Sequence, residues 1–257
     1  MAPRDIALAV LTSVIWGVAF VATKFGLDGF SAPQLAAARF IIAALPVLVL
    51  PRPRVSWGLL IAIGLTLFAG QFVLLFFAYA NGMPPGLASV TQQMQVFFTV
   101  PLAAACFREI PTPRQSLGMA IAFCGLLVIG ATIGGDLTLT ALAFAIAAAL
   151  SWAIGNVLVR FAGHVAMVAL MAWASLVVPL PALALSWVLD ANSNLATTIV
   201  AAPWLAIASA IYLGTLVNQC CLRGLESAAD PLSDSARRAV CAVGAVRRRG
   251  CLSVSIR

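Results

Sequence analysis

The sequence predicts an all-α membrane protein whose chain crosses the bilayer several times. Of its 257 residues, 63% are hydrophobic and only 9% are charged. The mean hydropathy of +1.06 lies far above that of a water-soluble domain. Apolar runs of about 20 residues, the length that crosses the hydrocarbon core as a helix, recur along the chain. A closed β-barrel would instead show strands of about ten residues with alternating polarity, so helices are expected.

Arg, Asp, Pro and Gly residues divide the chain into apolar runs that predict eight membrane helices, at 6–26, 33–50, 57–80, 86–107, 115–133, 137–161, 165–189 and 203–222. The first run is too long for the core of a signal peptide and is not followed by a cleavage site, so we expect it to remain as the first helix. Residues 51–54 separate the second run from the third. Arg108 ends the fourth, Gly134 and Gly135 form a turn before the sixth, and Asp190 ends the seventh.

The charges of the connecting loops predict how the helices are oriented. Lys and Arg accumulate on the cytoplasmic side of membrane proteins, so a cytoplasmic N-terminus is expected in an inner membrane. With that orientation the cytoplasmic segments carry Arg4, Arg52, Arg54, Arg108, Arg114 and Arg160. The opposite loops carry Asp28, Asp136 and Asp190, with at most Lys24 as a cation.

The sixth helix repeats the pattern of the first. Trp16 is followed eight positions later by Lys24, and Trp152 is followed eight positions later by Arg160. The two tryptophans are 136 residues, or five helices, apart, and an odd number of helices makes the second copy insert with the opposite orientation. We therefore predict a first repeat at 1–134 and a partial second repeat at 135–222. Such inverted repeats are typical of secondary transporters.

The C-terminal segment does not continue this pattern. Two five-helix repeats need ten helices, yet residues 223–257 contain seven Arg and three acidic residues and no long apolar run. The expectation is a frameshift or truncation that begins near Val217. The alternative is a native polybasic tail attracted to anionic lipid.

Several segments resemble the EamA family of drug/metabolite transporters, and most closely its exporters of O-acetylserine and cysteine. The resemblance covers about residues 5–216. It rests on Trp16 and Gly17, on the Ala38–Arg39–Phe40 stretch, on residues 81–89 and 93–99, and on the Arg108–Glu109 pair. It implies ten helices in two inverted repeats, a central substrate cavity and export activity.

Polar residues inside predicted membrane helices are candidates for the transport site, because burying them in hydrocarbon is costly. The fourth helix is the richest: Gln92, Gln95 and Thr99 fall on one face of an uninterrupted helix, and Gln93 points elsewhere. Amides offer donors and acceptors to a zwitterionic amino acid. We select Gln93 and Gln95 as cavity-lining residues. Interhelical hydrogen bonding is the alternative role.

Six further residues, Arg39 among them, complete the candidate substrate site. Gln71 and Tyr79 lie on nearly the same face of the third helix, although packing explains them equally well. Asn156 lies one turn after Trp152, so both can share a cavity wall. For Trp152 and Trp16 the alternative is a belt of aromatic residues at the membrane interface.

Arg39 lies about 9 Å into the second helix, at 1.5 Å per residue. It can snorkel to the outer interface, or it can bind a substrate carboxylate or a gate partner near the extracytoplasmic side. The acidic residues, including Glu109, fall at the ends of helices, so a buried carboxylate relay for protons or sodium is not supported.

These observations predict an exporter of amino acids or related metabolites that works by alternating access, with a small amino-acid-like molecule and the lipid bilayer as its partners. No cofactor, metal or nucleic acid is expected, and the six cysteines have neither metal-ligand nor disulfide spacing. An intramembrane protease would need a histidine near a buried serine, and the single histidine, His164, is predicted in a loop. An inactive truncated transporter or a non-transporting membrane scaffold remains the alternative. The oligomeric state is left open.

Overall fold

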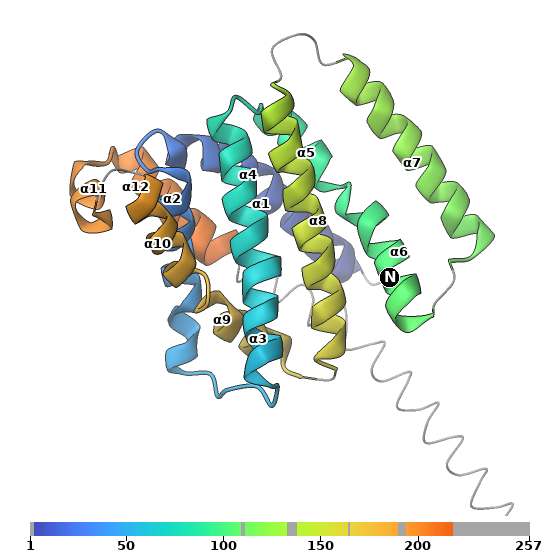
Figure 1. Ribbon diagram of the computed structural model, residues 1–257, viewed down its shortest axis with the longest axis horizontal. Helices are drawn as coiled ribbons and strands as arrows, with labels where there is room; N and C mark the ends of the chain where they lie inside the picture. Colours follow the sequence, from blue (N-terminus) through green and yellow to red (C-terminus); the bar gives the residue numbers. More distant parts are fainter. Residues whose placement is uncertain (1–2, 109–110, 133–137, 164, 190–193, 218–257) are drawn as a thin grey trace, which may run out of the picture.

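The computed structural model describes residues 3–108, 111–132, 138–163, 165–189 and 194–217, apart from some side chains within α1 and α7 (Figure 1). Every regular element in these ranges is helical, so the prediction of an all-α membrane protein is confirmed. Four stretches are long and apolar enough to cross a membrane: Val10–Leu27, Trp57–Ala80, Leu139–Phe161 and Met167–Leu189. Ala32–Leu48 and Trp204–Thr215 are shorter apolar helices.

The first half of the chain begins with the long helix α1, Pro3–Leu27, and the buried helix α2, Ala32–Ala44, which continues as a 3₁₀ turn at Leu45–Leu48. The third predicted helix comprises α3, Trp57–Ile63, a π-helical segment, Gly64–Gly70, and α4, Gln71–Ala80. It is followed by α5, Pro85–Gln92, and α6, Gln95–Phe107. Helix α7, Pro113–Thr132, lies along the edge of the molecule (Figure 1).

The second half begins with α8, Leu139–Phe161, whose first turn is capped by the Thr138 hydroxyl. Helices α9, Met167–Ser175, and α10, Pro179–Leu189, follow. The short helix α11, Leu195–Ala201, was not predicted. Helix α12, Trp204–Tyr212, continues as a π-helical segment at Leu213–Val217.

Two predicted continuous helices are broken, which corrects the sequence-based boundaries. The run at 165–189 divides after Ser175, because Pro179 and Pro181 have no backbone N–H and cannot continue the hydrogen bonding of the preceding turn. The run at 86–107 divides at Gln93 and Met94, although that stretch contains neither Gly nor Pro. Residues 218–222, which were predicted to end the eighth helix, lie outside the described part of the chain.

Small side chains allow the central helices to approach closely. On α8, Ala141, Ala145, Ala148 and Ala149 are completely buried. Six residues after Ala149, a Cβ atom added to Gly155 would lie 2.6 Å from the Cα atom of Leu67 in the first π-helical segment. This contact requires glycine, and it holds α8 against the third predicted helix.

The two halves of the chain pack on each other reciprocally. When each helix is replaced by its counterpart in the other half, the same kind of pair results. Helix α1 packs on α12, and α8 packs on α4 and the π-helical segment before it. Helix α2 lies against α9 and α10. Counted as the eight predicted helices, the first therefore packs on the eighth, the sixth on the third, and the second on the seventh.

Candidate functional site

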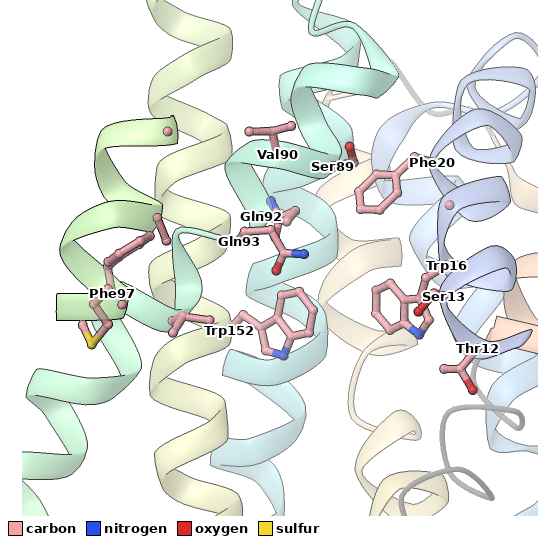
Figure 2. A pocket seen from close by; sticks show the side chains of 16 residues that line it. Thr12, Ser13, Trp16, Phe20, Ser89, Val90, Gln92, Gln93, Phe97 and Trp152 are labelled. Carbon is pink, nitrogen blue, oxygen red and sulfur yellow. The ribbon is translucent and has the colours of Figure 1, made fainter. Parts of the chain in front are cut away.

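A cavity of about 880 Å³ opens between α1, the α5–α6 pair, α7 and the start of the second half at α8. Figure 2 shows side chains from these helices gathered around one space. The wall formed by α7 consists of the small residues Gly118, Ala122 and Gly125, together with Met119. The opposite wall is aromatic, with Phe20 on α1 and the Trp16 and Trp152 rings.

The break between α5 and α6 lies in the cavity wall. Just before it, the Thr91 hydroxyl donates to the carbonyls of Leu87 (3.0 Å) and Ala88 (3.1 Å), a form of back-bonding that bends and weakens helices. At the break the N–H groups of Gln93 and Met94 donate to Val90 and Thr91, three residues back instead of four. Irregular backbone at membrane depth occurs where it lines a cavity or is buried in protein, and discontinuous helices form the substrate sites of many transporters.

Two glutamines line the cavity at the end of α5, and their environments differ. The Gln93 side chain is exposed to the cavity, as Figure 2 shows. Gln92 is only 2% exposed, and neither its Nε2 nor its Oε1 atom has a hydrogen-bond partner. A buried amide without partners costs about 1–3 kcal/mol. Gln92 is therefore a candidate for binding a group that enters the cavity, although Gln93 and Gln95 were the residues selected from the sequence.

Gln95 lies on the other side of the break and does not line the cavity. The Nδ2 group of Asn156 on α8 donates a hydrogen bond to the Gln95 Oε1 atom at 2.7 Å. The uninterrupted helix that would align Gln92 with Gln95 does not form. In the structure Gln95 and Asn156 thus join α6 to α8, which is the interhelical alternative considered above.

Trp16 and Trp152 stack on each other. Their ring centroids are 5.6 Å apart and their planes differ by 8°. Both rings line the cavity, so neither belongs to an interfacial aromatic belt. The equivalent residues of the two predicted repeats therefore meet in the interior, at the contact between α1 and α8.

Arg39 and Gln71 lie together in a smaller recess of about 20 Å³ behind Trp16 and Phe20. Both side chains are 2% exposed, so of the two interpretations of Arg39 the structure does not support snorkelling to the interface. The Arg39 guanidinium lies 3.8 Å from the centroid of the Phe72 ring, an arrangement that stabilises a cation beside an aromatic face. Gln71 begins α4 directly after the π-helical segment, and its Nε2 group has no hydrogen-bond partner.

Tyr79 serves the packing of the bundle. Its hydroxyl donates to the Phe20 carbonyl at 3.2 Å, and the ring lies in a second core cluster between α4 and α8. It lines neither the large cavity nor the recess. Of the two interpretations of Tyr79, the structure therefore favours a packing role over substrate binding.

The described residues contain no group of three metal-ligating side chains. Asp28 is exposed in the turn after α1. The predictions for His164, Glu109, Asp136 and Asp190 concern residues outside the described ranges.

Comparison with known proteins gives consistent matches. Residues 4–131 match the EamA-like transporter family. A probable amino-acid metabolite efflux pump of Salmonella typhimurium is 36% identical over 220 residues, which cover 83% of this chain and 74% of that protein. Its Escherichia coli counterpart, with the same name, is 35% identical over the same shares of the two chains. A probable terminal-alkyne amino-acid exporter of Streptantibioticus cattleyicolor is 33% identical over 80% of this chain and 70% of that protein.

Proposed function

Because this chain belongs to the EamA-like transporter family, we propose that it exports amino acids or related small metabolites across the membrane by alternating access. The relatives named as amino-acid metabolite efflux pumps and as an amino-acid exporter support this substrate class and the direction of transport. The inner membrane of the cell is the location that we propose.

The observation that carries the proposal is the buried, unpartnered amide of Gln92 in the wall of the cavity. An amide offers donors to a carboxylate and an acceptor to an ammonium group. Gln93, two hydroxyl residues on α1, Thr12 and Ser13, and Ser89 on α5 add neutral polar groups. A site built from neutral groups can bind a zwitterion and release it again. The cavity of about 880 Å³ is within the range of small-molecule sites and accommodates an amino acid with room for water.

Two inverted repeats, 1–134 and 135–222, explain how the cavity can open to either side. The proposal is supported by the reciprocal packing of the two halves and by the Trp16–Trp152 stack, since equivalent residues meet at the axis that relates two repeats. The third helix of each set contains a π-helical segment, at Gly64–Gly70 and Leu213–Val217. Rocking one set against the other would separate the two indole rings.

We propose that the N-terminus is cytoplasmic. Arg160 at the end of α8 lies over the Phe107 ring at the end of α6, 4.5 Å from its centroid, and Arg52 lies 3.9 Å from the Trp57 centroid at the start of α3. The cationic ends of these helices lie on one side of the bundle (Figure 1). An excess of Arg and Lys at one membrane face favours the cytoplasmic side.

Transport into inverted membrane vesicles tests the proposal. Vesicles that contain the protein should accumulate labelled cysteine or O-acetylserine, and Trp16→Ala should reduce the initial rate about tenfold because it removes one wall of the site. Trp187→Ala is the matched control, since this tryptophan on α10 is 67% exposed and does not line the large cavity. Wild-type vesicles that accumulate no amino acid would refute the exporter and favour the non-transporting scaffold.

A further inference from the structure

The recess behind Trp16 and Phe20 has a composition unlike that of the large cavity. Its polar lining consists of Thr23, Arg39 and Gln71, and the rest is apolar. Arg39 brings a permanent positive charge and only hydrogen-bond donors. The Gln71 Nε2 group is a further donor that is buried without a partner. The Thr23 hydroxyl already donates to the Ala19 carbonyl at 2.8 Å, so its hydrogen is used.

The size of the recess limits what can enter it. A volume of about 20 Å³ is room for one water-sized atom or ion, since about 10–15 Å³ is the minimum for a water molecule. A whole amino acid does not fit. One oxygen atom of a carboxylate, or one halide ion, does.

The recess and the large cavity share a boundary. Trp16 and Phe20 each line both spaces and therefore lie between them. A group held in the recess therefore lies directly behind the ring that stacks on Trp152. A substrate with its body in the large cavity can reach Gln71 with one end once the Trp16 ring moves aside, which is the motion proposed for alternating access.

We propose that Gln71 and Arg39 form an anion subsite, which binds either the carboxylate of the transported amino acid or a free halide ion. The carboxylate form rests on the proposed export function, and the halide form does not. In the low dielectric of the membrane interior the positive charge favours an anion over neutral water. The Gln71 amide then supplies the directional hydrogen bond, and hydrogen bonds to charged groups are stronger than those between neutral groups.

Bromide is the probe for this subsite because it quenches tryptophan fluorescence and Trp16 lines the recess. The full chain is purified into lipid nanodiscs, and sodium gluconate is exchanged for sodium bromide at constant ionic strength. We expect a saturable component of quenching that Trp16→Phe removes. Gln71→Leu should weaken the apparent bromide affinity about tenfold, the scale of one charge-assisted hydrogen bond. Gln71→Asn, which shortens the side chain but keeps the amide, provides the same comparison if the leucine variant does not fold.

Gln92→Leu is the matched control in the large cavity. It should leave the bromide component unchanged, because Gln92 does not line the recess. Cysteine and cysteamine, which lacks the carboxylate, then separate the two sources of the anion. If cysteine suppresses the bromide component and cysteamine does not, the subsite binds the substrate carboxylate. If neither competes, it binds a free halide.

The proposal is overturned if quenching rises linearly with bromide in the wild type, and if cysteine binds with the same affinity to wild type and Gln71→Leu. The recess would then hold only water. If the protein binds bromide saturably through Gln71 but transports no amino acid, the anion subsite stands and the proposed export function is refuted.

Discussion

Replacing Gln92 with leucine should stabilise the substrate-free protein while it weakens substrate binding. The two side chains have similar volumes, so the substitution keeps the packing at the end of α5. In the structure Gln92 is 2% exposed and both polar atoms of its amide lack partners. The wild-type protein therefore bears the cost of burying an amide, and under the proposed function substrate binding relieves that cost.

The expected size of the effect follows from those two atoms. A buried polar group without a partner costs about 1–3 kcal/mol, so Gln92→Leu should raise the free energy of unfolding by an amount in this range. Gln95→Leu on α6 provides the matched comparison, because the Gln95 Oε1 atom accepts a 2.7 Å hydrogen bond from Asn156. That variant should lower the free energy of unfolding. Two Gln→Leu substitutions at positions three residues apart should therefore change the free energy of unfolding in opposite directions.

Reversible unfolding in mixed micelles gives both free energies, and binding of labelled cysteine to the same samples gives the affinities. Gln92→Leu should reduce the affinity about tenfold or more, and Gln95→Leu should leave it within about twofold. A loss of stability in Gln92→Leu would show that the amide already has structural partners. The assignment of Gln92 to the substrate site would then be refuted.

Two further predictions concern the packing of α8. Gly155→Val should lower the free energy of unfolding by about 1–3 kcal/mol, because its Cβ atom would lie 2.6 Å from the Leu67 Cα atom. The control Gly58→Val, whose added Cβ atom would have nothing within 4 Å, should lower it by less than about 1 kcal/mol in the same unfolding assay. Equal losses in the two variants would contradict the close contact. A double-mutant cycle of unfolding with Asn156→Leu and Gln95→Leu should give a coupling energy of about 0.6–2 kcal/mol. Strictly additive effects would show that the hydrogen bond between these two side chains does not join α6 to α8.

The fold could be predicted from the sequence because membrane helices are marked by long apolar runs. The break at Gln93 could not, because it needs no Pro or Gly. Its local signal is the Thr91 side chain, which bonds to its own helix at the start of a polar stretch. Prolines did mark the division between α9 and α10, but a proline also lies inside the continuous helix α6, at Pro101. Proline alone therefore does not decide whether a helix ends.

The candidate site was predicted in part. The positions of Trp16 and Trp152 in the chain suggested equivalent roles, and the structure stacks the two rings in the cavity wall. Helical spacing placed Gln92 and Gln95 together, and the break separates them. The Phe72 ring that lies against the Arg39 guanidinium comes from another helix, and spacing along α2 cannot reveal such a contact.

Efflux of labelled amino acids from intact cells tests the central claim most directly. Cells that carry this chain are loaded with labelled cysteine or O-acetylserine and compared with cells that carry Gln92→Leu and with cells that lack the protein. Export through a site that contains Gln92 predicts fast efflux with the wild type, and efflux reduced about tenfold with Gln92→Leu at equal amounts of protein in the membrane. Equal efflux from all three kinds of cell would contradict it.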